Sequence, residues 1–131
     1  MKAMLSIKPE YVARILSGEK TYEYRRRIFK RRDVDTLVIY ATSPSRAVVA
    51  EASITGIIAE PPEDLWERTH ENAGIDRDRF MAYFEGRDVA YAIELGKITR
   101  YDRPRDLREY APTVKAPPQS YVYITRQDPN E

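Results

Sequence analysis

The chain has 131 residues, of which 42% are hydrophobic and 33% charged, a size and composition typical of one globular domain. It has no cysteine and one histidine, His70, so we expect no disulfide, no thiol chemistry, no zinc or other metal site and no cofactor. It shows neither a signal peptide nor a run of about 20 apolar residues, which predicts a soluble, cytoplasmic protein without a membrane partner.

The first part of the chain predicts a strand, a helix and a second strand. Residues 3–7 alternate weakly in polarity, as in a short strand. A helix is predicted from Pro9 to Gly18, because proline suits a first helical turn, apolar residues recur at helical spacing and glycine commonly follows a helix end. Residues 21–24 are β-branched and aromatic, which favours a strand.

The middle of the chain predicts two further strands and two helices. Residues 36–41 form an apolar run of strand length, expected to be buried on both faces. Residues 48–58 predict a long strand, in which Gly56 indicates a bulge or bend. Helices are predicted over residues 63–71 and 76–85, with Trp66 and Phe80 facing the core and His70 on the surface.

The C-terminal part predicts two more strands around a proline-rich segment. Residues 90–98 alternate as a strand, residues 104–118 are expected to be irregular, and residues 120–124 predict a last strand. We expect one domain over residues 1–126 and a frayed tail over residues 127–131. Because helices are few, the fold class is α+β, with a curled mixed or antiparallel β-barrel whose openings are covered by helices.

Charge is distributed unevenly along the sequence. Residues 1–50 carry eleven Lys/Arg and five Asp/Glu, a net charge of +6, whereas residues 51–131 carry eleven and sixteen, a net charge of −5. The densest basic stretch spans residues 25–32. A field of this sign attracts polyanions, although a solvated basic turn would show the same composition.

The segment most informative about chemistry follows the first helix and reads Gly18-Glu19-Lys20-Thr21-Tyr22-Glu23-Tyr24-Arg25. Strand alternation places Glu23 and Arg25 on one face, next to a helix end that carries Lys20. A carboxylate beside a guanidinium can read the edge of a base or help hold a phosphate. A surface salt-bridge ladder is the alternative.

The spacing Gly-x-Lys-x-x-Glu-x-Arg after an amphipathic helix resembles the ASCH domain family, within the PUA-like group. Gly18, Lys20, Glu23 and Arg25 match its four positions. The resemblance extends over most of the chain, through segments 5–9, 39–44 and 118–121. It implies a PUA-like barrel with a basic cleft that binds RNA or a modified nucleoside.

The resemblance and the basic run together predict an RNA-binding site. We expect the phosphates to meet Arg26, Arg27, Lys30 and Arg31, and one base to be probed by Lys20, Glu23 and Arg25. Tyrosines on nearby strands could stack on bases or simply pack in the fold. The full predicted RNA-binding set is Lys8, Lys20, Thr21, Glu23, Arg25, Arg26, Arg27, Lys30, Arg31, Tyr40, Ser43, Gln119, Ser120 and Tyr121.

Two other functions stay open alongside binding, with binding ranked first. One is an enzyme acting on a nucleoside or RNA, because the resemblance includes amidohydrolases that deacylate a modified cytidine and ribonucleases. Its catalytic residues would be Lys20, Glu23 and Glu71, but Glu23 stands where those amidohydrolases have a nucleophilic threonine. The other is a regulatory domain that recruits a protein partner through its acidic helices. The oligomeric state is not predicted.

Overall fold

The computed structural model describes residues 1–125, so the predicted tail over residues 127–131 lies outside the described residues. The elements in chain order are β1 (Lys2–Ile7), α1 (Pro9–Ser17), β2 (Tyr22–Arg25), β3 (Thr36–Ala41), β4 (Ala47–Glu60), α2 (Pro62–Thr69), the 3₁₀ turn η1 (His70–Asn72), α3 (Arg77–Tyr83), β5 (Ala90–Arg105), α4 (Leu107–Tyr110) and β6 (Val122–Ile124).

The predicted order of strands and longer helices is confirmed, with corrections after β4. The last turn of the predicted 63–71 helix is the 3₁₀ turn η1, and β5 continues to Arg105 because its partner β4 extends equally far, pairing Val48 with Arg105. The segment predicted to be irregular also contains α4, whose first turn is capped by the Asp106 carboxylate, 2.8 Å from the Arg108 amide.

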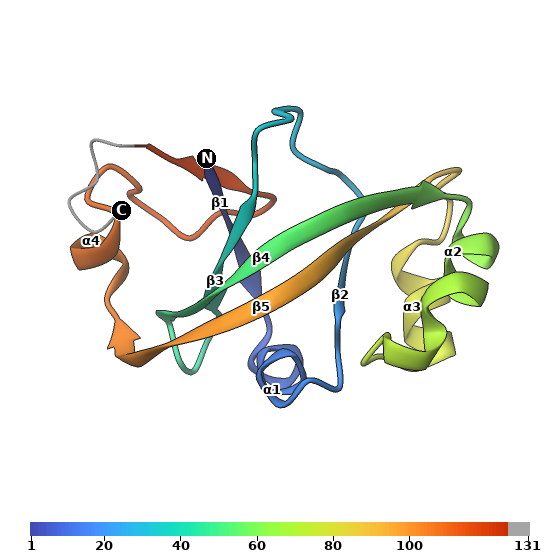
Figure 1. Cartoon of the computed structure of the whole chain (residues 1–131), viewed down its shortest axis with the longest axis horizontal. Helices are drawn as coiled ribbons and strands as arrows, with labels where there is room; N and C mark the ends of the chain where they lie inside the picture. Colours follow the sequence, from blue (N-terminus) through green and yellow to red (C-terminus); the bar gives the residue numbers. More distant parts are fainter. Residues whose placement is uncertain (126–131) are drawn as a thin grey trace.

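The strands form one mixed six-stranded sheet in the order β2-β5-β4-β3-β1-β6. β1 runs parallel to β3, and the other pairings are antiparallel. β4 and β5 cross the whole width of the molecule as a long ribbon, with α2 and α3 at one end and α4 at the other (Figure 1). The predicted irregularity at Gly56 is confirmed by a register shift between Ile54 and Gly56.

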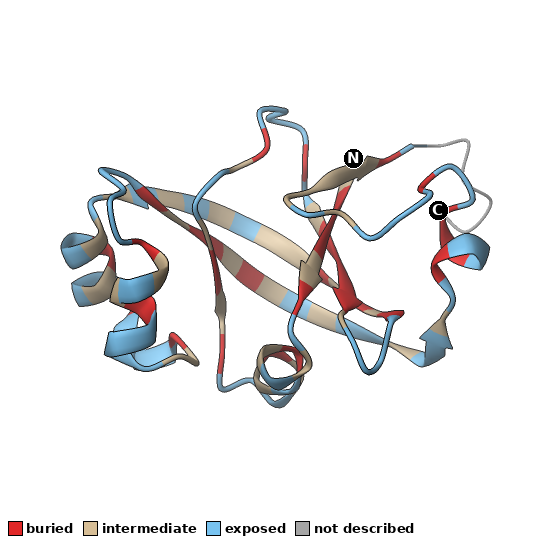
Figure 2. Ribbon diagram, turned by 180° about the vertical axis from the view of Figure 1, so that it is seen from behind, coloured by how far each residue is buried: buried red, intermediate tan, exposed pale blue. Residues whose placement is uncertain are grey.

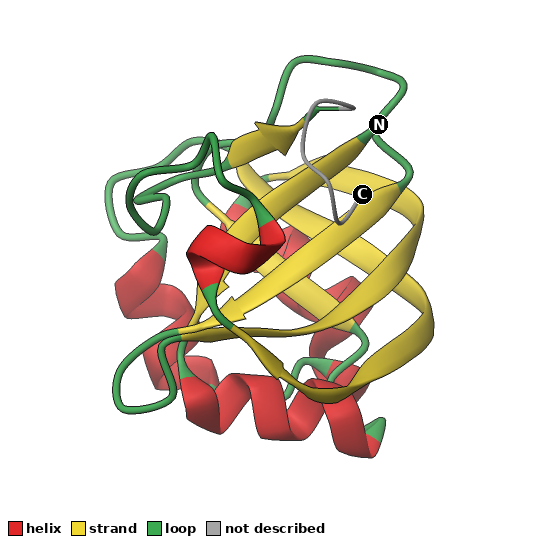
Figure 3. Cartoon of the chain, turned by 90° about the vertical axis from the view of Figure 1, so that its left-hand side faces the viewer, coloured by secondary structure: helices red, strands yellow, loops and turns green. Residues whose placement is uncertain are grey.

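The α+β class is therefore confirmed, but the closed barrel is not. The sheet is strongly curled (Figure 3), yet the described strands leave β2 and β6 as its two edges without pairing them to each other. The Arg25 side chain of β2 instead donates hydrogen bonds to the carbonyl oxygens of Ser6 in β1 and of Ser120, which lies just before β6. Side-chain contacts of Arg25 near β6 therefore bridge the two edges of the sheet, and no strand ladder closes the sheet among the described residues.

Apolar side chains are buried in three clusters, two of which border the site. Val12 and Ile15 of α1 pack onto the sheet with Leu5, Leu37 and Ile39. A second cluster joins Tyr24 of β2 to the inner faces of α2 and α3, and a third lies under α4. Figure 2 shows the outward faces of these helices exposed and their inward faces buried. None of the helices described here has the length and apolar character needed to span a bilayer.

Candidate functional site

The turn between α1 and β2 directs Lys20 into the protein. Gly18 ends α1 with φ of 87°, a left-handed conformation that glycine adopts without steric cost, and its N–H bonds the Ile15 carbonyl. The next amides are fixed in turn, since the Lys20 N–H donates to the Arg14 carbonyl and the Thr21 N–H to the Asn72 carbonyl. The segment after η1 is thereby held against this turn.

Lys20 is enclosed on every side, with 4% of its surface exposed. Its Nζ donates to the Ala73 carbonyl at 2.8 Å and lies 4.7 Å from the centre of the Tyr24 ring and 5.5 Å from that of Tyr11. Burial lowers the pKa of Lys20, the charge of Arg14 acts in the same direction, and Glu23 opposes both. The ring faces and Glu23 stabilise the ammonium that burial disfavours.

Gly74 makes this enclosure possible. A Cβ at this position would lie 2.4 Å from the Lys20 Cβ, and the Gly74 φ of +64° is itself unfavourable for other residues. The Gly74 carbonyl also accepts a hydrogen bond from Arg14 at 2.8 Å. The α1–β2 turn and the loop after η1 therefore interlock through one glycine.

β2 presents Glu23 and Arg25 on the same side, as the alternation predicts. Glu23 is 6% exposed, and its Oε2 accepts a hydrogen bond from Arg25 Nη1 at 3.2 Å. Arg25 also donates to the carbonyl oxygens of Ser6 at 3.5 Å and Ser120 at 3.0 Å. No other described residue donates a hydrogen bond to Glu23 Oε1. We refer to Lys20, Glu23 and Arg25 as the floor.

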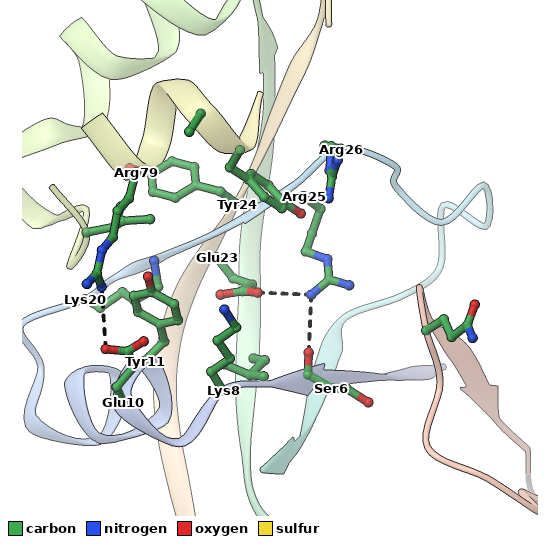
Figure 4. Close-up of a pocket in the computed structure, with 15 residues that line it drawn as sticks. Ser6, Lys8, Glu10, Tyr11, Lys20, Glu23, Tyr24, Arg25, Arg26 and Arg79 are labelled. Atoms are coloured by element: carbon green, nitrogen blue, oxygen red, sulfur yellow. Dashed lines mark hydrogen bonds and ion pairs between the residues drawn. The ribbon is translucent and has the colours of Figure 1, made fainter. Parts of the chain in front are cut away.

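A cleft of about 730 Å³ lies over the floor, between α1, β2 and α3 (Figure 4). The lining of the cleft holds five cationic side chains and two anionic ones, Glu10 and Glu23. Lys8 and Gln119 lie at its rim, and in Figure 4 the exposed Lys8 side chain points toward Glu23. The excess of positive charge suits an anionic ligand. The five cations are Lys8, Lys20, Arg25, Arg26 and Arg79.

Helix α3 forms the wall of the cleft opposite α1. Arg79 of α3 reaches Glu10 of α1, with 3.6 Å between its Nη1 and the carboxylate. The Tyr83 ring supports Arg26, whose guanidinium lies 4.6 Å from the ring centre. Beneath them Tyr24 bonds Thr69, with 2.7 Å between the hydroxyl oxygens, and burial raises the pKa of Tyr24 to about 12.

The structure brings six of the predicted RNA-binding residues together at this cleft: Lys8, Lys20, Glu23, Arg25, Arg26 and Gln119. The others do not line it, and two of them have clear alternative places. Tyr40 is 5% exposed in the core beside α4, and Ser120 contributes its backbone oxygen to Arg25. The remaining six are Thr21, Arg27, Lys30, Arg31, Ser43 and Tyr121.

Glu71 lies in a neighbouring hollow of about 400 Å³, which shares Ile75 and Arg79 with the cleft but not Lys20 or Glu23. Glu71 therefore does not lie in the cleft with Lys20 and Glu23, the other two residues of the predicted catalytic set. His70 is exposed, as expected, and Trp66 packs with its ring centre 5.0 Å from that of Phe80. Within residues 1–125, no three His, Asp or Glu side chains converge to hold a metal ion.

The basic loop, residues 26–33, is anchored rather than loosely solvated. Phe29 is 6% exposed in the main core and meets Tyr121 edge to face, with ring centres 6.0 Å apart. The Arg31 amide donates to the Tyr123 hydroxyl at 3.2 Å, while its guanidinium holds Asp33 at 2.7 Å. This pairing lowers the pKa of Asp33 to about 2. Arg26 is the one cation of this loop that lines the cleft.

Sequence reasoning missed the residues that α1 and α3 contribute to the cleft. Arg79 and Tyr83 are four residues apart on α3, so they share a stripe beside the buried stripe of Phe80 and Phe84. Tyr11 and Glu10 lie in the first turn of α1. The signal was a polar-aromatic stripe flanking an apolar one, but the sequence did not indicate that the stripe faces β2.

Comparisons with known proteins match this architecture. The family model described as "ASCH domain" matches residues 5–102. A protein of Zymomonas mobilis, described as an ASCH domain-containing ribonuclease, is 32% identical over 130 residues, covering 97% of this chain and 86% of that protein.

Solved structures agree with the sequence comparisons. The crystal structure of ASCH from Zymomonas mobilis superposes with a TM-score of 0.87 at 32% identity, covering 96% of this chain and 89% of that one. The N-terminal domain of Staphylothermus marinus McrB shares the fold alone, with a TM-score of 0.53 at 10% identity over 87% of this chain and 81% of that chain.

Proposed function

Because the chain belongs to the ASCH domain family, we propose that its cleft binds RNA or another single-stranded nucleic acid, one nucleotide at a time over the floor. The observation that carries the proposal is the pairing of exposed cations at the rim with a buried carboxylate below them. Lys8 and Arg26 suit phosphates, and Glu23 suits a group that donates hydrogen bonds.

Residues 1–126 act as one ASCH/PUA-like unit in the cytoplasm. The curled sheet is the counterpart of the PUA-like barrel, and Arg25 of β2 bonds the segment that leads into β6. Arg27, Lys30 and Arg31 attract the phosphate chain from outside the cleft, and Arg25 holds Glu23 in place rather than reading the ligand.

The test is a salt titration of the binding of short single-stranded RNA. We expect log affinity to fall linearly with log salt concentration, with a slope set by the number of phosphates contacted. Replacing both Lys8 and Arg26 by alanine should reduce that slope by about 1.4, because each phosphate contact on a single strand contributes about 0.7. Lys97→Ala is the matched control, because Lys97 is exposed on β5 outside the cleft. A flat titration contradicts the proposal.

RNA cleavage is the second candidate, and the Zymomonas mobilis relative described as a ribonuclease favours it. Glu23 would accept a proton in the cleft, with the Lys20 ammonium supplying positive charge nearby. At saturating labelled RNA, wild-type protein should then cleave and Glu23→Gln should not. Cleavage that persists unchanged in Glu23→Gln would exclude this role.

Deacylation of a modified cytidine is not part of the proposal. Glu23 occupies the position expected for a nucleophilic hydroxyl, and Thr21 does not line the cleft. We expect no hydrolysis of acylated cytidine by the wild-type chain, and chromatography of the reaction products checks this.

A further inference from the structure

The three side chains of the floor differ in how many contacts they already make within the protein. The Lys20 ammonium is used by the Ala73 carbonyl and two aromatic faces. The Arg25 guanidinium is used by Glu23 and two carbonyl oxygens. In contrast, Oε1 of Glu23 receives no hydrogen bond from the other described residues, since Arg25 bonds Oε2 (Figure 4). The floor therefore offers a ligand a carboxylate acceptor beside two cations that already bind protein oxygen atoms.

An acceptor at the floor decides which part of a nucleotide enters the cleft. A phosphate placed there would bring its own negative charge against Glu23, whereas the two floor cations that could offset this charge each already donate to an oxygen atom of the protein. Exposed cations lie instead at the rim, as Lys8 and as Arg26 on Tyr83. The favourable orientation therefore has the base inward and the phosphate outward.

We propose that the floor selects guanine among the four bases, an inference that rests on the proposed RNA binding. The guanine edge carries two adjacent donors, N1–H and N2–H₂, which match the two oxygens of one carboxylate, and an acceptor O6 beside them. Lys8, which points toward Glu23 in Figure 4, is the donor for O6. Adenine and cytosine place an unprotonated ring nitrogen beside their amino group, and uracil flanks its single N–H with two carbonyl oxygens.

The decisive experiment compares single-stranded oligouridylates that differ in one central nucleotide: guanosine, inosine, adenosine or cytidine. A 2′-O-methyl backbone prevents cleavage through the 2′-hydroxyl during the titration. We expect guanosine to bind about 5- to 150-fold more tightly than adenosine or cytidine, the discrimination typical of a bidentate contact. Inosine, which lacks the N2 amino group, should lie in between.

Glu23→Gln tests the residue, since it keeps the shape and replaces one acceptor oxygen by an amide donor. The preference for guanosine over adenosine should disappear in this variant. Glu85→Gln removes the same charge at an exposed site outside the cleft and should retain the preference. The inosine comparison uses the wild-type chain, so it decides the question even where Glu23→Gln fails to fold.

The outcomes separate this inference from the proposed function. Equal affinity for all four central nucleotides, with a normal salt dependence, overturns guanine selection and leaves RNA binding standing. Tighter binding of the adenosine or cytidine oligonucleotide than of the guanosine one by the wild-type protein also overturns it. Absence of binding to every oligonucleotide at low salt overturns the proposed function itself.

Discussion

The floor of the cleft and the basic loop both carry lysine and arginine side chains, but those of the floor are enclosed and most of those of the loop are exposed. Lys20 and Arg25 are enclosed and bonded to carbonyl oxygens, aromatic faces or Glu23. Arg27, Lys30 and Arg32 of the loop are exposed, while the loop backbone is held down by Phe29. The density of basic residues in the sequence therefore identifies the loop, whereas the floor of the cleft is identified by the burial of its charged side chains.

The difference has a consequence for how a ligand would be held. Exposed cations act at a distance and are screened by salt, so in the proposed function the loop would contribute to the encounter with RNA more than to the selection of a base. Buried groups have fixed positions and a low local dielectric, so a mismatch at the floor has a high energetic cost. Four predictions test this division between the exposed loop and the buried floor.

The first concerns the anchor of the loop. Phe29→Ala removes a buried ring from the main core, so we expect the free energy of unfolding to fall by about 3–5 kcal/mol. Ile57→Ala, at a site 42% exposed, should lower it by less than about 1 kcal/mol. Urea denaturation measures both. Similar losses for the two variants would show that the loop is merely solvated.

The second concerns the interlock under the floor. Gly74→Ala places a Cβ 2.4 Å from the Lys20 Cβ in a left-handed backbone, and we expect a loss of about 2–4 kcal/mol. Gly86→Ala has φ of +78° but meets nothing within 4 Å, so it isolates the backbone cost of about 1 kcal/mol. Equal losses in the two variants would mean that Lys20 is not tightly enclosed.

The third concerns alkaline pH. Because burial raises the pKa of Tyr24 from 10.0 to about 12, the folded state keeps this proton when the unfolded state has lost it. The contribution is complete below pH 10 and is lost as the pH rises toward 12, a fall of about 2–3 kcal/mol. Lys20 acts in the opposite direction, since its pKa is lowered from 10.5 and its burial penalty lessens with rising pH.

Tyr24→Phe isolates the tyrosine in that experiment. Thr69 keeps a partner in this variant, because its hydroxyl also lies 2.7 Å from the Leu65 carbonyl. The free energy of unfolding should then fall less steeply between pH 10 and 12 than in the wild type. Tyr101 and Tyr110, whose pKa values burial also raises, contribute equally to both chains and cancel in the difference. Identical pH profiles would refute the assignment.

The fourth compares two arginines of the loop. Arg26 lines the cleft on Tyr83, so Arg26→Ala should weaken RNA binding by about 1 kcal/mol, alike for all sequences. Arg31 is already paired with Asp33 and lies outside the cleft, so Arg31→Ala should have the smaller effect. Fluorescence anisotropy measures both. A change of base preference in Arg26→Ala would contradict its role as a phosphate contact.

The order of elements could be predicted because each carries a local signal. Pro9 and Gly18 bracket α1, the apolar run of β3 reads as a buried strand, and Gly56 indicates the bulge in β4. The length of β5 could not be predicted, because its last residues pair with the start of β4 and have little strand propensity of their own. Helix α4 was missed because a single capped turn has no periodicity.

The site was predicted only as far as one segment determines it. Glu23 and Arg25 meet because strand alternation places residues two apart on one side. The enclosure of Lys20 depends on Ala73 and Gly74, which come more than fifty residues later in the chain. No local sequence pattern predicts that contact. The acceptor character of the floor follows from which hydrogen bonds are used, which is a property of the folded chain.

The interlock of Lys20 with Gly74 also constrains when the site can exist during synthesis. The basic run, residues 25–32, is synthesised about fifty residues before Arg79 on α3 and about ninety residues before Gln119 and the Ser120 carbonyl. Domains complete their packing as units once their segments are available. A chain that has left the ribosome only as far as the basic loop therefore displays that positive charge before the residues that complete the cleft have been made.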